Sequence, residues 1–539
     1  MKRNKIALSG LALAGVVSLT LAGCASGAGN NDADGDIIRV NGTEPQVGLF
    51  STDTNEVGGG KIVDSIFSGL ITYEADGTTV LDVAEDISID SDNQLTVTIR
   101  EGLEFTNGEE ITADNFINAW NYGAALDNEQ RQAYFYSYIA GYSAEENVDE
   151  LSGLEQIDDH TFTITTEGTP AADFAERLGY SAYYPMPDVA FEDMAAFGEN
   201  PVGNGPYMLA EEGAWQHNVQ IDLVANPSYD GPRTPKNDGL RIVFYANEEA
   251  AYADLQAGNL DILDNVPQSM FSVYEDDFPG RTVNMGTALN QTITIPGWLE
   301  HFSGGEGQLR RQAISMAIDR EEIADVIFHG SRLPMVDFSS PVVEGWSDEI
   351  EGNEVLSFNP EKAAELWAQA DEIAPFSGSF KIGYNADSSH EAWVEAVANQ
   401  LRTNLEIDAS GDAYPTFAEF RSQITAGQID SAFRTGWQAD YPGLYNFLGP
   451  LFATGASSND GKFSSEAFDG LLSEGLEFVG VDNIAAAEKF NEAQSVLLAE
   501  LPAIPLFYQN AVGAWTENVE NVEFAWNSVP VYTEVTVAP

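Results

Sequence analysis

The chain has 539 residues, of which 43% are hydrophobic and 11% aromatic, enough for two or three folded domains with substantial cores. It carries 86 Asp and Glu residues against 23 Lys and Arg, a formal net charge of -63 at pH 7, which excludes nucleic acid and anionic lipid as natural partners. The acidic residues are spread along the chain. They indicate either a solvated coat that keeps the protein soluble or a field that attracts cationic ligands. With a single cysteine, the fold has to be held by its core.

The first 24 residues have the pattern of an export signal. A basic start precedes an apolar run over residues 6–20, and small residues then lead to Cys24. The apolar run is short for a membrane span and is interrupted by Ser and Gly. The ending Leu-Ala-Gly-Cys resembles the lipobox of bacterial lipoproteins. This resemblance implies a signal peptide over 1–23, acylation of Cys24 and a lipidated tether over 24–36. We therefore expect an exported protein that touches the cytoplasmic membrane, on its outer face, only through this anchor.

Strands and helices alternate along the first half of the chain. Alternating apolar residues predict strands at 95–99, 161–164 and 219–223, and a more buried strand at 240–245. Thr112 is placed to cap a helix in which Phe116, Ile117, Trp120 and Ala124 share one face.

The second half is richer in helices. Leu309, Ala313, Ala317, Ile323, Val326 and Ile327 form an apolar stripe that stops at Gly330. Capping residues predict three further helices. One begins at Asn359-Pro360, and a second runs from a capping box at Thr416 to Gly427. The third runs from Asp482 to about Glu500, and its apolar face consists of Ile484, Phe490, Ala493 and Leu497. A strand is predicted at 429–435. Helices and strands mixed throughout indicate α/β lobes.

Six segments follow one another along nearly the whole mature chain. They are 41–45 (NGTEP), 102–114 (GLEFTNGEEITAD), 204–207 (NGPY), 310–323 (RRQAISMAIDREEI), 433–441 (FRTGWQADY) and 501–507 (LPAIPLF). Together they resemble the peptide-binding family, family 5, of the extracellular substrate-binding proteins that serve ABC importers. The run Arg-Thr-Gly-Trp-Gln-Ala-Asp at 434–440 is similar to that of the oligopeptide-binding members.

The resemblance implies an α/β fold with two lobes, the periplasmic-binding-protein-like fold of type II, cluster C, with an extra subdomain inserted in the first lobe. Carried onto this chain, lobe 1 is 37–284 plus 506–539, the inserted subdomain lies within about 62–198, and lobe 2 is 285–505. The segments 282–295 and 504–508 are then the two crossovers between the lobes.

Asp440 is the first candidate for ligand binding. It lies just past a predicted strand that follows a helix, and ligands of open α/β sheets bind outside the carboxyl ends of strands. A carboxylate in a closing cleft can balance the ammonium group of a peptide when water is excluded. The resemblance implies that Asp440 binds the α-amino group. The alternative is a simple turn at 440–443 with a helpful aspartate.

Three further candidates precede Asp440 on the same run. The resemblance implies that Arg434 meets the carboxylate of a short peptide, although a buried structural ion pair is the alternative. Trp437 is expected to form the wall of a side-chain pocket or to pack in the core. Gly436 is expected to let the ligand backbone approach closely.

The first lobe supplies a second set of candidates. The aromatic cluster of Tyr134, Phe135, Tyr136, Tyr138 and Tyr142 is either a wall of the peptide site or part of the core. Glu44 and the segment 55–60 fall where the first lobe of family members faces the cleft.

The function implied is capture of oligopeptides between closing lobes by a monomer, without a cofactor, and delivery to the permease subunits of an ABC importer. Some members of this broad family bind oligosaccharides, nickel chelates or haem, and some are receptors for signalling peptides. The same fold with another ligand or with a receptor role is therefore the alternative. An enzyme is disfavoured because the sequence has no Gly-x-Ser-x-Gly elbow, phosphate loop or paired histidines with the spacing of metal ligands. A glycosidase stays formally open because acids are so abundant.

Overall fold

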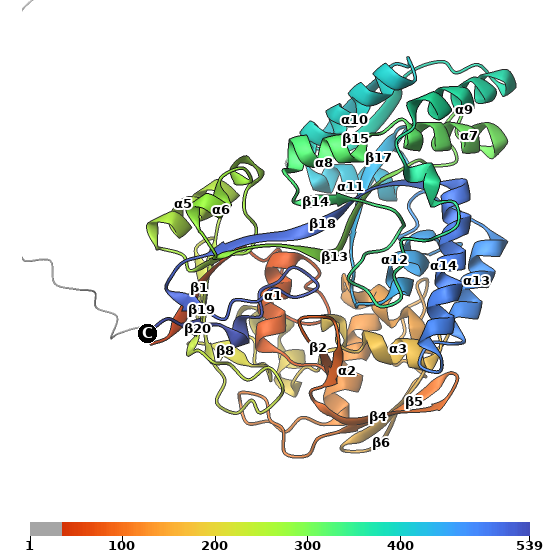
Figure 1. Ribbon diagram of the computed structural model, residues 1–539. Coiled ribbons are helices and arrows are strands. Elements are labelled where there is room, and N and C mark those ends of the chain that lie inside the picture. Colours follow the sequence, from red (N-terminus) through yellow and green to blue (C-terminus); the bar gives the residue numbers. More distant parts are fainter. Residues whose placement is uncertain (1–34, 387, 457) are drawn as a thin grey trace, which may run out of the picture. The chain divides into compact units, whose positions relative to one another are not determined.

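The computed structural model describes residues 35–386, 388–456 and 458–539 (Figure 1). Cys24 and almost all of the predicted tether lie outside the described residues, so lipidation at Cys24 stays a prediction. Residues 36–539 form one unit, and everything below concerns this unit.

A sheet that runs through both lobes organises the fold. Within the described residues, its strand order is β16 (Ala409–Tyr414), β15 (Phe380–Asn385), β17 (Ala432–Gln438), β13 (Thr282–Thr294), β18 (Ala503–Trp515), β12 (Ile262–Leu263), β1 (Ile37–Gly42), β11 (Gly239–Phe244), β10 (Gln220–Ala225) and β8 (Tyr207–Leu209). Two short strands join it at the side, β14 (Arg332–Pro334) on β18 and β9 (Trp215–Gln216) on β10.

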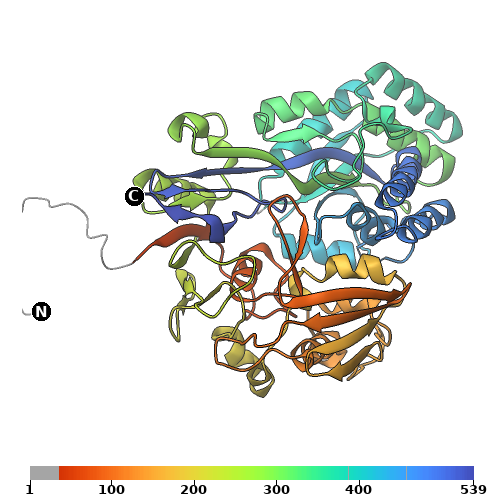
Figure 2. The ribbon, with the colours of Figure 1, turned by 60° about the horizontal axis from the view of Figure 1, so that its bottom comes forward.

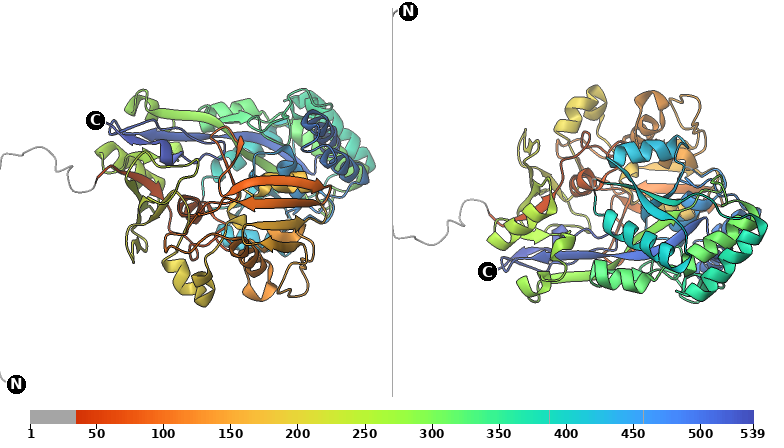
Figure 3. Two further views of the ribbon diagram at one scale, coloured as in Figure 1. Left: turned by 90° about the horizontal axis from the view of Figure 1, so that it is seen from below. Right: turned by 90° about the horizontal axis from the view of Figure 1, so that it is seen from above.

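The long strands β13 and β18 connect the lobes. They pair antiparallel, with a register shift between Gly286 and Asn290, and Figure 3 shows them running side by side from one lobe to the other. The predicted crossover at 282–295 is confirmed as strand β13. The predicted crossover at 504–508 lies within β18, which continues to Trp515. Because both strands pass from one lobe to the other, bending of this strand pair would change the angle between the lobes.

The first lobe contains a second sheet, with the order β4 (Ala84–Ser91), β5 (Gln94–Ile99), β7 (Thr161–Thr165) and β6 (Leu154–Asp158). Helix α2 (Ala113–Ala124) packs on it through Phe116 and Trp120, which are fully buried against Phe162. Its first turn is fixed by Thr112, whose backbone N–H donates to Asn115 Oδ1 at 2.8 Å. The predicted strands at 95–99 and 161–164 and the predicted helix start are confirmed.

Most of the remaining helices surround the other end of the large sheet (Figures 1 and 2). They are α7 (Gly304–Met316), α8 (Arg320–Phe328), α9 (Pro360–Ile373), α10 (Glu391–Asn404), α11 (Phe417–Thr425), α12 (Leu444–Phe452), α13 (Glu466–Leu476) and α14 (Asn483–Glu500). Lobe 1 also holds α1 (Val57–Ile66), α3 (Ala171–Arg177), α4 (Met194–Glu199), α5 (Glu248–Ala257) and α6 (Tyr274–Asp277). The helix starts predicted at Asn359, Thr416 and Asp482 are confirmed, because each side chain accepts a hydrogen bond from the first turn.

Three predicted details are wrong. The stripe from Leu309 to Ile327 is two helices, because Asp319 caps α8 by accepting from the Glu322 N–H, and Val326 is 67% exposed. Ile484 on α14 is 76% exposed, since the first turn of that helix projects beyond the core. The strand predicted at 429–435 is β17 at 432–438, because Ile429 packs with residues of α11 before the strand begins.

The apolar cores separate along the chain as a two-lobed fold requires. One core contains residues from 288 to 507 together with Trp526. A small core of residues 420–433 lies in the same part of the chain. Two further cores contain residues from 38 to 278 together with residues from 511 to 535. This separation supports the lobe bounds given above, which we retain as a proposal.

Candidate functional site

A cavity of about 340 Å³ is bounded by residues of both lobes, within the range of roughly 300 to 1,000 Å³ for small-ligand sites. Lobe 1 contributes the first turns of α1 and the segments around 179–184 and 206–207, and lobe 2 contributes the end of β17. The C-terminal segment 525–533 closes a third side. Of the predicted site residues, Asp440 and the segment 55–60, through Asn55, Glu56, Val57 and Gly60, line this cavity.

Asp440 is held in place by Asn446 of α12. The Asp440 N–H donates to Asn446 Oδ1 at 3.0 Å, and Asn446 Nδ2 donates to Asp440 Oδ2 at 3.1 Å. Trp437 Nε1 donates to the same Oδ1 at 2.9 Å. Asn446 is 1% exposed, so one buried amide fixes both the loop after β17 and the orientation of the carboxylate.

The remaining oxygen of Asp440, Oδ1, accepts no hydrogen bond from the described residues. Burial raises the pKa of Asp440 to about 6, against the opposing effects of the Asn446 hydrogen bond and the charge of Arg177. Burial, and then the charge of Asp440, also raise the pKa values of Tyr134 and Tyr180, so tyrosine hydroxyls lie close to the carboxylate. An ionised Asp440 is therefore incompletely compensated, and a cation in the cavity would stabilise it.

Asp64 brings a second carboxylate from lobe 1. It lies on α1, lines the same cavity and accepts a hydrogen bond from the Tyr184 hydroxyl at 3.3 Å. Burial raises the pKa of Asp64 to about 6, although Arg233 and the Tyr184 hydrogen bond oppose the shift. No sequence pattern distinguished this aspartate, because only the packing of α1 turns it toward the cavity.

Arg434 lies apart from this cavity. It lies within β17, whereas Asp440 follows the end of that strand at Gln438. Its guanidinium donates to Asn385 Oδ1 and lies 5.2 Å from the ring centroid of Phe417 and 5.5 Å from that of Phe420. It is not among the residues that line the cavity, and its role toward a peptide carboxylate stays a prediction.

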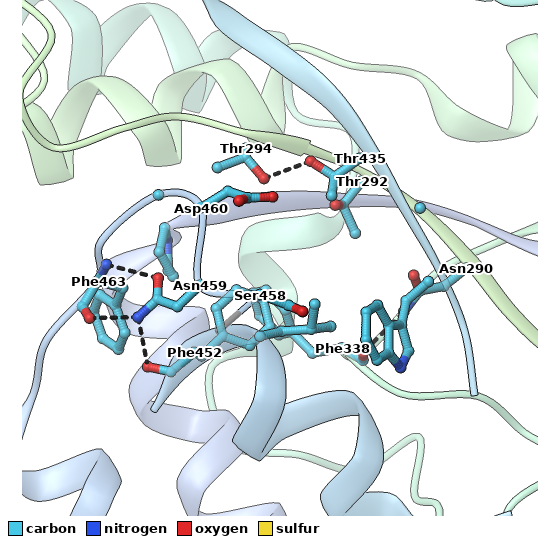
Figure 4. Close-up of a pocket in the computed structure, with 15 residues that line it drawn as sticks. Asn290, Thr292, Thr294, Phe338, Thr435, Phe452, Ser458, Asn459, Asp460 and Phe463 are labelled. Atoms are coloured by element: carbon cyan, nitrogen blue, oxygen red, sulfur yellow. Dashed lines mark hydrogen bonds between the residues drawn. The ribbon is translucent and has the colours of Figure 1, made fainter. Parts of the chain in front are cut away.

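Gly436 and Trp437 line a separate pocket of about 30 Å³ in lobe 2, shown in Figure 4. On one side of it, the hydroxyls of Thr294 and Thr435 lie 2.6 Å apart. On the other side, Asn459 bonds to the backbone of Phe463. Trp437 also packs against the lobe 2 core, so its position serves the core and the fixing of Asp440. A contact of Trp437 or Gly436 with ligand stays a prediction.

The other lobe 1 candidates also lie outside the lining of the large cavity. The Tyr138 ring lies 4.1 Å from the Arg177 guanidinium. Glu44 Oε1 lies 2.8 Å from His217 Nδ1, and its Oε2 accepts from the Asn218 N–H at 2.6 Å. Tyr136 belongs to the core, where it donates to the Ala182 carbonyl at 2.6 Å. Roles of Tyr138 and Glu44 in ligand binding stay predictions.

Sequence reasoning missed Asn446, Asp64 and Arg177. Arg177 could have been found as the partner of Asp173 at the i,i+4 spacing of a helix. Its guanidinium also lies 5.3 Å from the ring of Tyr441 and 5.5 Å from the ring of Tyr445, both of lobe 2. Asn446 and Asp64 gave no local signal.

Among the described residues, no group of three or more His, Cys, Asp and Glu side chains is arranged to hold a metal ion. No helix among them combines the length and apolar character needed to cross a membrane.

Comparisons with known proteins agree on one class. Residues 78–459 match the family described as bacterial extracellular solute-binding proteins, family 5 Middle. The chain is similar to the oligopeptide-binding protein OppA of Bacillus subtilis, with 24% identity over 94% of this chain and 95% of that protein. It is also similar to the dipeptide-binding protein DppE of the same organism, with 24% identity over 97% of each. The structure of the Escherichia coli murein tripeptide binding protein MppA matches with a TM-score of 0.78 and 21% identity, over 94% of this chain and 99% of that chain.

Proposed function

The chain belongs to family 5 of the bacterial extracellular solute-binding proteins, and from this premise we propose that it captures peptides between its two lobes and delivers them to an ABC importer. The ligand is an oligopeptide, as the names of its relatives suggest. The permease and the ATPase that drive import are separate proteins. An acyl group on Cys24 holds this monomer at the outer face of the cytoplasmic membrane.

The environment of Asp440 is the observation that supports peptide capture most directly. Asp440 lines the cavity bounded by both lobes, its carboxylate is fixed by Asn446, and one of its oxygens has no donor among the described residues. An α-ammonium group supplies both a positive charge and three donors, so it compensates this carboxylate once water is excluded.

Closure and binding are coupled in this scheme. The ligand stabilises the closed state only by the difference between its affinities for the closed and the open state. A peptide can contact Asp440 of lobe 2 and α1 of lobe 1 at the same time only when the lobes are closed. A peptide that makes both contacts therefore favours closure. Backbone hydrogen bonds to strand edges would add affinity with little sequence preference.

Replacement of Asp440 tests the assignment of the peptide amino terminus. Asp440→Asn keeps the hydrogen bonds to Asn446 but removes the charge, and we expect a loss of about 2 to 5 kcal/mol in peptide affinity. Isothermal titration calorimetry with a tripeptide measures it, and the N-acetylated form of the same tripeptide is the matched ligand control. The acetylated peptide should bind weakly to the native protein and be little affected by the replacement. Equal affinity of the native and Asp440→Asn proteins for the free tripeptide would remove Asp440 from the site.

A further inference from the structure

The large cavity holds more negative charge than one peptide ammonium group can balance. Among the described residues that line it, the charged ones are Glu56, Lys61, Asp64, Arg233 and Asp440. Three of these are carboxylates and two are cations. Whether the cavity suits a singly or a doubly positive ligand depends on the groups with which the two cations pair.

Both cations pair with acids outside the lining. Lys61 forms an ion pair with Asp264. Arg233 Nε lies 3.7 Å from Asp82, and its other nitrogens donate to the carbonyls of residues 64 and 67 and to a serine hydroxyl. Asp82 also contacts Arg100, which in turn pairs with Asp230, so this group of two arginines and two aspartates is neutral.

The three lining carboxylates accept hydrogen bonds from neutral groups, while the charges of Arg233 and Arg177 act on Asp64 and Asp440 from beyond ion-pair distance. Asp440 is bonded to an asparagine and Asp64 to a tyrosine hydroxyl. Glu56 caps α1, where its Oε1 accepts from the Gly59 N–H at 2.9 Å. None of the three has a cationic side chain within ion-pair distance among the described residues. Three ionised carboxylates around one cavity disfavour one another's charge, and cations that enter the cavity relieve this cost.

Asp64 and Asp440 face the same tyrosine from opposite lobes. Burial raises the pKa of the Tyr180 hydroxyl, and the charges of both aspartates raise it further. Tyr180 itself lines the cavity. Both carboxylates line this one cavity, so a ligand that fills it can meet both.

We propose that Asp64, with Glu56 at the cap of α1 lining the same cavity, binds a second positive charge, the side chain of a lysine or arginine in the first two residues of the peptide. This proposal rests on the proposed function, because it takes Asp440 to hold the α-amino group. A basic side chain on residue one or two then starts within roughly 7 Å of the α-amino group, since each extended residue adds roughly 3.5 Å. The ligand class is then peptides with a basic amino-terminal end.

Calorimetry at pH 7.5 with two matched tripeptides, Ala-Lys-Ala and Ala-norleucine-Ala, tests this subsite. The side chains have similar length and differ in charge, so the ratio of their dissociation constants isolates the charge. The native protein should favour Ala-Lys-Ala by about tenfold or more, and Asp64→Asn should bring the ratio close to one. Asn keeps an acceptor for Tyr184. Asp64→Ser is a second replacement, and Glu145→Gln, which removes an exposed charge, should leave the ratio unchanged.

The outcomes separate this proposal from the proposed function. If both tripeptides bind and Asp64→Asn keeps the native ratio, the second-charge subsite is overturned and peptide capture stands. If Ala-Lys-Ala and Ala-norleucine-Ala both fail to bind the native protein, peptide capture itself fails. 1,5-Diaminopentane is a further probe, because it carries two ammonium groups without a peptide backbone. Its binding as tightly as Ala-Lys-Ala would identify a diamine site and overturn the assignment to peptides.

Discussion

At the scale of single residues, the site depends on one aspartate and the amide that orients it. Asp440 could be predicted from its place after a strand and from the run that ends with it. Asn446 could not be predicted, because its importance comes from three hydrogen bonds that exist only when α12 packs against the end of β17. Asp64 was missed for the same reason. The sequence shows that a residue is a carboxylate. Whether its side chain points into a cavity depends on how its helix packs in the folded protein.

The affinity for a peptide without ionisable side chains should fall below pH 6. Burial raises the pKa of Asp440 to about 6 in the ligand-free protein. Ionisation of this buried carboxyl therefore costs folding stability as the pH rises to that value. An ammonium group of the ligand compensates the carboxylate and offsets this cost. Below pH 6 the carboxyl group is protonated, binding must release that proton, and the association constant should drop by up to about tenfold per pH unit. Calorimetry of an Ala-Ala-Ala peptide from pH 4.5 to 7.5 measures this, and Asp440→Asn should flatten the profile. An unchanged affinity at pH 5 would contradict the assignment.

Replacing Asn446 should damage both stability and binding. Asn446→Ala leaves the Trp437 indole N–H and the Asp440 N–H without their acceptor, and unfolding free energy should fall by about 1 to 3 kcal/mol per unsatisfied buried group. Peptide affinity should fall as well, because Asp440 loses its orientation. Urea unfolding and calorimetry measure the two effects. Asn399→Ala, at an exposed position on α10, is the matched control and should change neither.

At the scale of elements, local signals predicted capped helices well and failed where packing decides. Asn359, Thr416 and Asp482 cap the helices that their sequences indicate, because a cap involves only the adjoining turn. Val326 was wrongly placed on the apolar stripe from 309 to 327, because Asp319 begins a new helix within the stripe and that helix turns Val326 toward solvent. The strand after α11 was placed three residues early because Ile429 is buried by its neighbours without belonging to the sheet.

Helix α3 of lobe 1 contacts lobe 2 through Arg177, whose guanidinium lies near the rings of Tyr441 and Tyr445. Glu176 on this helix is a titratable group there, since burial and then Asp173 raise its pKa to about 7, while Arg177 lowers it and Glu344 of lobe 2 raises it. The raised pKa means that the neutral form is favoured in the closed protein. Stability from this group is present below its unfolded pKa of about 4.5 and is lost as the pH rises from there to about 7.

The contribution of Glu176 to the melting temperature of the ligand-free protein should therefore fall between about pH 4.5 and pH 7 and level off above, and this part of the pH dependence should disappear in Glu176→Gln. Differential scanning calorimetry measures both proteins. Glu167→Gln, at an exposed position in the same lobe, should keep the pH dependence of the native chain. Identical pH profiles for the native protein and Glu176→Gln would show that Glu176 does not titrate in this range.

At the scale of the whole molecule, the resemblance to the family predicted the two-lobed fold. The net charge did not decide between a coat that keeps the protein soluble and a field that attracts cationic ligands. A net charge of -63 attracts cations over distances of about a Debye length, 8 to 10 Å at physiological salt. The carboxylates of the cavity act at contact distance instead. The surface field should therefore govern association rates, and the cavity should govern dissociation rates.

Stopped-flow association of Ala-Lys-Ala and Ala-norleucine-Ala at increasing salt separates these effects. From about 20 mM to about 500 mM NaCl, the association rate of the lysine peptide should decrease more than that of the neutral peptide, because only the former gains from the field through its side chain. Asp64→Asn should change mainly the dissociation rate. An equal response of both peptides to salt would leave the acidic surface with a role in solubility alone.

The central claim is that this protein carries peptides, and native mass spectrometry of residues 25–539 tests it most directly. The purified protein is weighed before and after denaturation, and the released material is sequenced. We predict a heterogeneous set of peptides of similar length, with lysine or arginine enriched in the first two residues. Release of a single non-peptide mass, such as a metal chelate, haem or an oligosaccharide, would keep the two-lobed binding protein and contradict its assignment to peptides.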